Sequence, residues 1–168
     1  GKKYFLRILS FLQGTFWVDL PAHPDSLLKD LGSFLGEMDL ALQNFYHPGM
    51  YRYYVWDIKN ALDARANLFY IRSHEKRRIA AYCLSQFETE VSPRLSSLRM
   101  ASIHNDANDY NVLVKDGRIA GLIDFGDMVY SQLINNLAVA CAYAMFGALD
   151  PVRAATMVVQ EYHKKYPL

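Results

Sequence analysis

One stretch near the middle of the chain constrains the fold most, because it predicts a β-hairpin with polar side chains at its open end. The two predicted arms, Val112–Val114 and Ile119–Ile123, are apolar runs of strand length. Asp116 and Gly117 stand between them, and Asp-Gly is a strong signal for a two-residue hairpin turn. The chain is therefore expected to contain an antiparallel strand pair at this point.

An amide and a carboxylate are expected to share one face at the open end of this hairpin. With Val114 opposite Ile119, Asn111 falls opposite Leu122. Side chains alternate between the faces of a strand, so Asn111 and Asp124 become diagonal neighbours about 7–8 Å apart. Carboxylate and amide oxygens suit Mg²⁺, which takes few protein ligands and leaves places for water and phosphate. A register slip of one residue would put the two side chains on opposite faces.

A third polar residue, Asp106, lies in the predicted loop five residues before Asn111. A carboxylate there could accept a proton from an attacking hydroxyl beside the metal. The spacing H-x-D-x-x-x-x-N, followed by an apolar strand and D-F-G, is the pattern of the catalytic and metal-binding loops of kinases. In this chain the pattern reads His104, Asp106 and Asn111, then Asp124, Phe125 and Gly126. Each motif alone is common, but their agreement in order and spacing favours function over coincidence.

His104 has two possible roles. The kinase-like pattern makes it a candidate catalytic residue beside Asp106, but a histidine at this position is expected to hold the loop together rather than transfer protons. An aspartate that follows a strand, as Asp124 does, is also more often a turn former or helix cap than a metal ligand.

The rest of the chain predicts an α+β domain that is mostly helical. A first strand is expected over residues 3–12, and helices are expected over 24–45, 55–71, 73–95, 131–147 and 151–166. Asp25, Ser73 and Asp150 stand at the expected helix starts, and Pro93 marks an end or a kink of the third helix. No repeat or linker divides the chain, so residues 1–168 are predicted to form a single domain.

Composition excludes several classes of protein. Apolar residues make up 52% of the 168 residues, which is enough for a real core. A net charge of +1 gives no electrostatic footprint for nucleic acid or an anionic membrane, and no stretch is apolar enough to cross a bilayer. Cys83 and Cys141 lack metal-binding spacing, which indicates buried, reduced thiols of a cytoplasmic protein.

In these residues the chain resembles the aminoglycoside phosphotransferase and choline kinase-like family. "SIHNDANDYNVLV" and "GLIDFGD" are similar to the family's H-G-D-x-x-x-x-N and I-D-F/W motifs. "RILSFLQG" and "LLKDLGSFLGEMDLAL" resemble its hinge strand and first large-lobe helix, so the resemblance covers nearly the whole chain. The segment "IDFGDMVYS" is most similar to the hydroxylysine kinase-like branch.

The resemblance implies a protein kinase-like C-terminal lobe with a small β-hairpin insert. No glycine-rich loop or strand lysine is seen upstream, so the N-terminal nucleotide lobe is expected to be absent. The chain is then expected to begin at the interlobe hinge, at about residues 1–14. Its partners would be that lobe or other domains of a longer chain, and the isolated lobe is expected to be inactive.

The resemblance also implies ATP- and Mg²⁺-dependent phosphorylation of a hydroxyl on a small molecule, such as an amino alcohol, hydroxylysine or an aminoglycoside. Asp106 would be the catalytic base, and Asn111 and Asp124 would bind Mg²⁺. The adenine of ATP would lie at three hinge residues, Ser10, Phe11 and Leu12.

Two residues depart from the family pattern. Asn105 replaces the usual glycine, which is tolerable because asparagine adopts unusual backbone angles readily. Asn136 stands where many members have an acidic residue that braces the catalytic loop. These departures leave open an alternative function, a catalytically incomplete, pseudokinase-like binding or regulatory module of a larger enzyme. A protein kinase lobe is disfavoured because a helix follows Asp124 almost at once.

Two further aspartates are candidate substrate-binding residues, each with a structural alternative. Asp127 could bind a substrate ammonium group, or it could cap the helix expected near Ser131. Asp57 could face the substrate, but a helix cap is favoured, with Trp56 packed in the core.

An apolar patch is expected on the hinge face, where the nucleotide lobe would normally cover side chains. The residues concerned are Phe5, Leu6, Ile8, Phe11, Phe16 and Trp17. Exposure of such a patch predicts a homodimer or aggregation through the hinge face.

Overall fold

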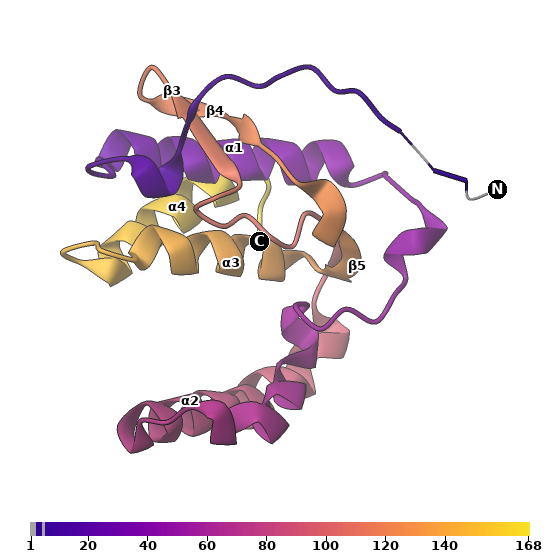
Figure 1. Cartoon of the computed structure of the whole chain (residues 1–168), viewed down its shortest axis with the longest axis vertical. Coiled ribbons are helices and arrows are strands. Elements are labelled where there is room, and N and C mark those ends of the chain that lie inside the picture. Colours follow the sequence, from indigo (N-terminus) through magenta and orange to yellow (C-terminus); the bar gives the residue numbers. More distant parts are fainter. Residues whose placement is uncertain (1–2, 5) are drawn as a thin grey trace.

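Three helices form the main body of the protein. The computed structural model describes residues 3–4 and 6–168. Helices α1 (Asp25–Leu42), α3 (Leu133–Met145) and α4 (Pro151–Lys165) lie side by side (Figure 1). The hairpin of β3 (Val112–Lys115) and β4 (Arg118–Leu122) covers one side of them (Figure 1). The predicted cap of α4 is confirmed, since the Asp150 carboxylate accepts a hydrogen bond from the backbone N–H of Arg153 at 2.9 Å.

Two glycines let α1 and α4 approach closely. A Cβ atom at Gly32 would lie 2.1 Å from the carbonyl oxygen of Val158, and one at Gly36 would lie 2.9 Å from that of Tyr162. Only glycine fits at such backbone contacts. Asp39 follows on the same helix face, because positions three and four apart share a face. Its side chain is thereby buried beside Tyr162.

The strands form two small antiparallel sheets. One has the order β1 (Thr15–Phe16), β3 (Val112–Lys115) and β4 (Arg118–Leu122). The other pairs β2 (Met100–Ile103) with β5 (Val129–Gln132). The second sheet places the end of β2, where the predicted catalytic loop begins, beside the start of β5.

The predicted hairpin is confirmed, but its register is wrong by one residue beyond the first pairs. Asp116 and Gly117 have φ angles of 52° and 74°, as the mirror-image turn requires. Val114 pairs with Ile119 as predicted, whereas the next pair along places Leu113 opposite Gly121. The extra residue on β4 is a β-bulge, which shifts every later pair.

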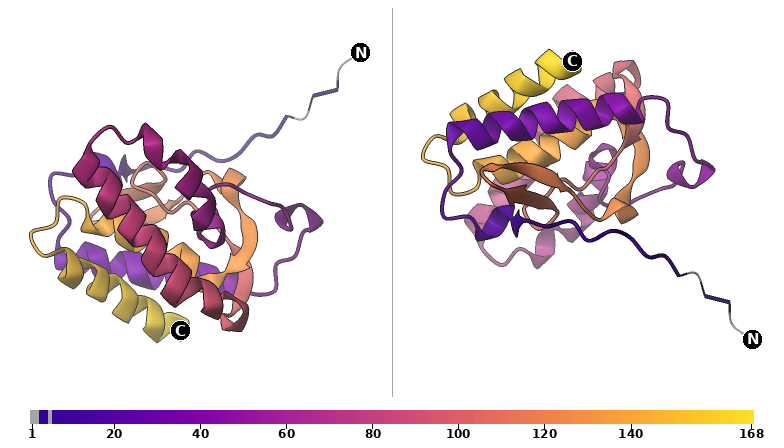
Figure 2. Two further views of the ribbon diagram at one scale, coloured as in Figure 1. Left: turned by 90° about the horizontal axis from the view of Figure 1, so that it is seen from below. Right: turned by 90° about the horizontal axis from the view of Figure 1, so that it is seen from above.

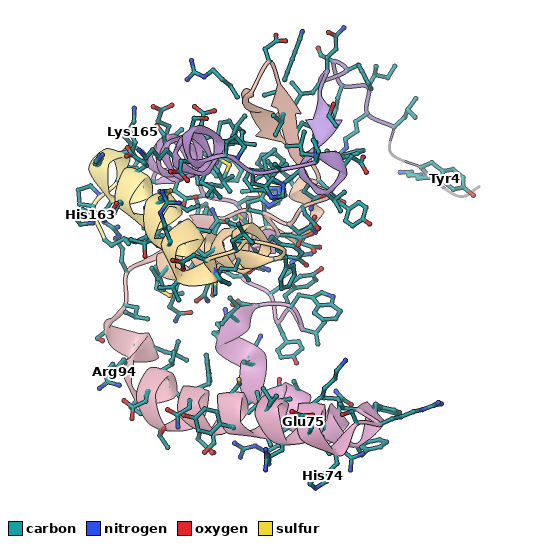
Figure 3. The ribbon with its side chains drawn as sticks, turned by 90° about the vertical axis from the view of Figure 1, so that its left-hand side faces the viewer. Tyr4, His74, Glu75, Arg94, His163 and Lys165 are labelled. Carbon is teal, nitrogen blue, oxygen red and sulfur yellow. The ribbon has the colours of Figure 1, made fainter. Side chains whose placement is uncertain are left out.

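The segment that follows α1 and precedes β2 in the sequence forms a helical arm, which projects from the body (Figure 1). It contains a 3₁₀ helix (Ile58–Tyr70), α2 (His74–Gln86), a π-helical turn (Phe87–Val91) and a second 3₁₀ helix (Ser92–Ser97). None of the residues in these elements is buried. Figure 3 shows His74 and Glu75 on the arm, well away from the main body.

The helix cap predicted on this arm is confirmed, but two burial predictions were wrong. Ser73 caps α2 by accepting from the backbone N–H of Lys76 at 3.3 Å. Trp56, expected in the core, has 72% of its surface exposed, and Cys83 is also exposed. Both lie in or beside an arm that packs against little else, so their apolar character does not bury them.

The strand predicted over residues 3–12 is also wrong, because only Thr15 and Phe16 pair with a neighbouring strand in this region. The described part of the segment runs away from the body (Figure 2). Extended backbone needs a partner to form a strand, and within residues 3–4 and 6–12 none is present.

The predicted apolar patch is confirmed in part. Leu6, Ile8 and Phe11 are exposed, whereas Trp17 is buried within this chain, where its ring stacks on His23 with centroids 4.2 Å apart. Phe5 lies outside the described residues. Within the described ranges, no helix combines the length and apolar character needed to cross a membrane.

Candidate active site

The predicted catalytic loop, residues 104–111, connects β2 to β3 and is fixed by its own backbone. The carbonyl of Asn108 accepts hydrogen bonds from the backbone N–H groups of Asn111 and Val112, at 3.1 and 3.2 Å. The Asn108 side chain also accepts from the N–H of Tyr110 at 2.8 Å. This turn holds Asp106 in a half-buried position that is still open to solvent.

Both carboxylate oxygens of Asp106 are held by side-chain amides. Asn108 donates to one oxygen and Asn111 to the other, each at 2.8 Å. Asn111 also donates to the backbone carbonyl of Asp106 at 2.9 Å. The structure therefore brings two of the predicted site residues together, and it leaves the amide oxygen as the atom that Asn111 can offer to a cation.

Asp124 follows the end of β4 and lies one residue beyond Ile123, which stands opposite Asn111 in place of the predicted Leu122. The predicted pairing that put Asn111 and Asp124 on one face of the hairpin is therefore wrong. The backbone N–H of Ile123 donates to the carbonyl of Asn111 at 3.0 Å. Asp124 then adopts a left-handed backbone, with φ of 60°, and its side chain accepts from the N–H of Gly126 at 3.1 Å. The left-handed turn ends the strand, so strict alternation of faces no longer sets the direction of this exposed side chain.

His104 links the loop to the segment that contains Asp124. Its Nδ1 accepts from the backbone N–H of Asp106 at 3.2 Å, so Nε2 carries the proton donated to the carbonyl of Ile123 at 3.0 Å. The ring also meets Phe125 edge to face, with centroids 4.6 Å apart. Burial lowers the pKa of His104 and favours this neutral form. The geometry favours the loop-holding interpretation over proton transfer.

The donor set at the open end of the hairpin suits a hard cation. Within the part of the chain that the structure describes, no three His, Cys, Asp or Glu side chains gather as a metal site. The predicted site uses one carboxylate, from Asp124, and one amide oxygen, from Asn111. Mg²⁺ is usually held by one or two protein carboxylates, with waters and substrate phosphates as its other ligands. The chemistry of the pair fits Mg²⁺, and the metal role of both residues stays a prediction.

Asp127 is held by a tyrosine rather than capping a helix, so the capping interpretation was wrong. α3 begins at Leu133, without a side-chain cap, while the Asp127 carboxylate accepts a short hydrogen bond from the hydroxyl of Tyr54. This bond, to a negatively charged acceptor, raises the pKa of Tyr54 to about 12. Arg52 lies 4.7 Å from the centre of the Tyr54 ring and donates to the carbonyl of Gly126 at 2.7 Å. The sequence did not predict the contacts of Tyr54 and Arg52 with residues 126–127, because both residues come from a loop that is distant in the sequence.

For Asp57 the capping interpretation is confirmed. Its carboxylate accepts from the backbone N–H of Lys59 at 3.2 Å and from the hydroxyl of Ser131 at 2.7 Å, and it pairs with the Lys59 ammonium at 2.9 Å. The side chain is buried and fully engaged in joining the arm to β5. These contacts occupy the Asp57 carboxylate, so they favour a structural role over substrate binding.

The predicted adenine hinge lies on the exposed N-terminal segment. Ser10 and Phe11 are exposed, and Leu12 packs over Gly121 of β4, where it would lie 2.6 Å from an added Cβ atom. A nucleotide contact for these three residues stays a prediction.

A buried network supports the residue before Asp106. The backbone N–H of Asn105 donates to the side-chain oxygen of Asn136 at 3.1 Å, and the Asn136 amide donates to Asp39 at 2.8 Å. The other oxygen of Asp39 accepts from the hydroxyl of Tyr162 at 2.7 Å. Asn136 therefore makes the loop contact expected of an acidic residue at its position. Asp39 was missed, although an acid at the spacing of an apolar stripe was a usable signal.

Substitutions at Asn105 should change the free energy of unfolding. Its φ is 70°, as expected for a position where the family has glycine, and no partner for either polar atom of its buried side chain lies within residues 3–4 and 6–168. Asn105→Gly removes an unpaired buried amide, worth about 1–3 kcal/mol, so we expect a modest net gain in unfolding free energy. Asn105→Ala keeps the left-handed strain and should be about 1–2 kcal/mol less stable than Asn105→Gly. Denaturant unfolding of the three proteins measures both differences, and a clear loss in Asn105→Gly would contradict the first.

Comparison with known proteins gives a family and a set of curated relatives. The model of the phosphotransferase enzyme family matches residues 1–167. Hydroxylysine kinase of Xenopus laevis is 29% identical over 182 residues, and that of Bos taurus is 26% identical over 180 residues. Each alignment covers 99% of this chain but 48% of the relative, so the chain spans about half the length of the curated relatives it matches.

Solved structures confirm the fold. An amicoumacin kinase, solved with AMP-PNP, Ca²⁺ and its ligand, superposes with a TM-score of 0.60 at 17% identity, covering 93% of this chain and 47% of that one. Aminoglycoside phosphotransferase APH(3'')-Id from Streptomyces rimosus gives 0.57 at 17% identity, covering 94% and 61%. The predicted mostly helical, kinase-like fold with small sheets is thereby confirmed.

Proposed function

Because the chain belongs to the phosphotransferase enzyme family, we propose that it forms the C-terminal lobe of a kinase, the lobe that carries the catalytic aspartate. This kinase would phosphorylate a hydroxyl of a small amine. The phosphate donor would be ATP with Mg²⁺, and the acceptor would be hydroxylysine or a similar amino alcohol. The observation that carries this proposal is the Asp106 carboxylate, which two amides hold at 2.8 Å on a fixed, half-buried loop.

Asp106 would act on the acceptor hydroxyl. The carboxylate orients the O–H of the substrate and takes its proton as the oxygen attacks the γ-phosphorus, and the bond from that phosphorus to the β,γ-bridging oxygen breaks. Phosphoryl transfer depends mainly on positioning and electrostatic stabilisation, so a fixed carboxylate is the part that this lobe should supply. His104 supports this role indirectly, because it ties the backbone of Asp106 to Ile123.

Asn111 and Asp124 are the residues that would hold the metal. When bound, Mg²⁺ would neutralise the charge that develops on the phosphate oxygens. The amide of Asn111 donates to Asp106 through its nitrogen, so the same side chain would join the base to the metal site through its oxygen.

The substrate amine has a candidate partner in Asp127. This carboxylate is only half buried, and it accepts a hydrogen bond from the hydroxyl of Tyr54. A carboxylate has lone pairs beyond the one used by Tyr54, so it could also accept a charge-assisted hydrogen bond from an ammonium group. His104 contacts the backbone of Asp106 and of Ile123, and its ring meets Phe125, so the proposed base and the segment that carries Asp124 lie on two sides of one imidazole ring.

A matched pair of acceptors tests the function. The full-length protein, incubated with ATP and Mg²⁺, is expected to add one phosphoryl group to hydroxylysine and none to lysine, which lacks the hydroxyl. Mass spectrometry of the amine and release of ADP measure the transfer. Equal ADP release with both amines would contradict the proposal. Binding of hydroxylysine without transfer would favour the pseudokinase-like alternative.

A further inference from the structure

Asp39 is a fully buried carboxylate whose contacts lead to the proposed catalytic loop. It lies on α1, and its two oxygens accept from the hydroxyl of Tyr162 on α4 and from the amide of Asn136 on α3. The other end of the Asn136 amide accepts from the backbone N–H of Asn105. A continuous chain of three hydrogen bonds therefore runs from α4 through two helices to the residue before Asp106.

Burial makes this carboxylate a poor source of stability. Removal from water raises the pKa of Asp39 to about 6, although the hydrogen bonds from Tyr162 and Asn136 and the charge of Arg99 act in the opposite direction. At neutral pH the ionised form therefore lowers the stability of the fold. For an acid with a raised pKa, the stabilising contribution is present below about pH 4 and is lost as the pH rises through 6. At neutral pH the role of Asp39 therefore lies in its two hydrogen bonds rather than in a favourable charge.

That role follows from the hydrogen-bonding chemistry of the two side chains. A carboxylate only accepts hydrogen bonds, whereas an amide has one accepting and one donating end. Asp39 therefore forces the NH₂ group of Asn136 towards itself, and the oxygen of Asn136 must face the N–H of Asn105. A neutral partner that could donate as well as accept would allow the amide to flip, which would place two donors against each other at the loop.

We propose that Asp39 is a positioning residue for phosphoryl transfer, and that it fixes the catalytic loop by setting the orientation of the Asn136 amide. In this chain the amide of Asn136 contacts the loop, and the carboxylate of Asp39 lies one hydrogen bond further from it. This inference rests on the proposed function only for its effect on turnover, since the orientation of the loop is measurable without it.

Single substitutions at Asp39 and Asn136 test the proposal first. Asp39→Asn should reduce the turnover number about tenfold or more, because displaced catalytic groups cost up to about a hundredfold, and KM should stay unchanged. Asn136→Asp places two carboxylates in contact and should impair both turnover and stability.

The double variant Asp39→Asn/Asn136→Asp should recover most of the lost turnover. The new carboxylate would accept from the Asn105 N–H and from the new amide at position 39, whose oxygen would accept from Tyr162. Glu37→Gln is the matched control, because Glu37 also lies on α1 and contacts α4, through Lys165 at 2.5 Å, but on the surface. It should leave turnover unchanged.

Hydrogen exchange at the Asn105 amide provides a readout that does not need activity. Exchange should be faster in each single variant and return towards the original rate in the exchanged pair. If the original protein transfers phosphate and Asp39→Asn changes neither turnover nor exchange, the inference is overturned. If the exchange rates follow this cycle but the original protein transfers no phosphate, the positioning role stands and the proposed function fails.

Discussion

Asp106→Asn is expected to lower the turnover number by about 10²–10⁴-fold, the range that a general base contributes. The substitution preserves size and removes the atom that would accept the substrate proton. Asn108 and Asn111 each donate to one oxygen of the carboxylate at 2.8 Å. In the variant, one of these two donors would face the new NH₂ group at position 106 instead of an oxygen. We therefore expect a loss of about 1 kcal/mol in unfolding free energy, which is too little to unfold the domain.

Asp109→Asn is the matched control for this variant. Asp109 lies in the same loop, and its contact with Val18 uses the backbone carbonyl rather than the carboxylate. The control therefore removes the same charge from the same loop without touching the proposed base. Steady-state ADP release with hydroxylysine compares the two variants. Equal turnover in Asp106→Asn and Asp109→Asn would remove Asp106 from the reaction.

Local sequence signals predicted those features that local chemistry determines. The Asp116-Gly117 turn was predicted because few residue pairs adopt two successive positive φ angles. The caps at Ser73 and Asp150 were predicted because a helix cap depends on only a few neighbouring residues. The order of His104, Asp106 and Asn111 also marked a segment whose members are directly hydrogen-bonded.

Features that depend on tertiary packing were not predicted. The bulge that shifts Leu113 opposite Gly121 leaves no mark on the apolar pattern, because the residues on both sides of it are small or apolar. Trp17 and Trp56 have the same apolar character, and only their positions on the body or the arm decide that one is buried and the other exposed. The predicted first strand failed for the same reason, since strand formation requires a partner that the sequence of the strand does not contain.

Asp39 shows why the most informative residue of the network was missed. Acidic side chains are usually exposed, so an acid near an apolar helix stripe is read as its polar border. Here Gly32 and Gly36 bring α4 so close that the next residue on that face is enclosed, whatever its charge. The Gly-x-x-x-Gly spacing and the following acid were both visible, but their meaning depended on the partner helix.

Asp124→Asn should reduce the apparent affinity for Mg²⁺ by at least about 10–100-fold, the loss typical even of residues that only support a metal ligand. The asparagine keeps an oxygen that can accept from Gly126, and it tolerates the left-handed backbone at this position. The change therefore isolates the negative charge from the local fold. Titration of turnover with Mg²⁺ should show a midpoint at higher concentration and a partial recovery at saturation.

Asp116→Asn provides the control for this second substitution. Asp116 is also an aspartate with positive φ in a tight turn, but it lies at the tip of the same hairpin, at the opposite end from the proposed site. Asn-Gly forms this turn as readily as Asp-Gly, so the variant should fold normally and keep its Mg²⁺ midpoint. If both variants kept the midpoint of the original protein, Asp124 would not be a metal ligand. A shift in Asp124→Asn alone would support a metal site at the open end of the hairpin, where Asn111 joins it to the proposed base.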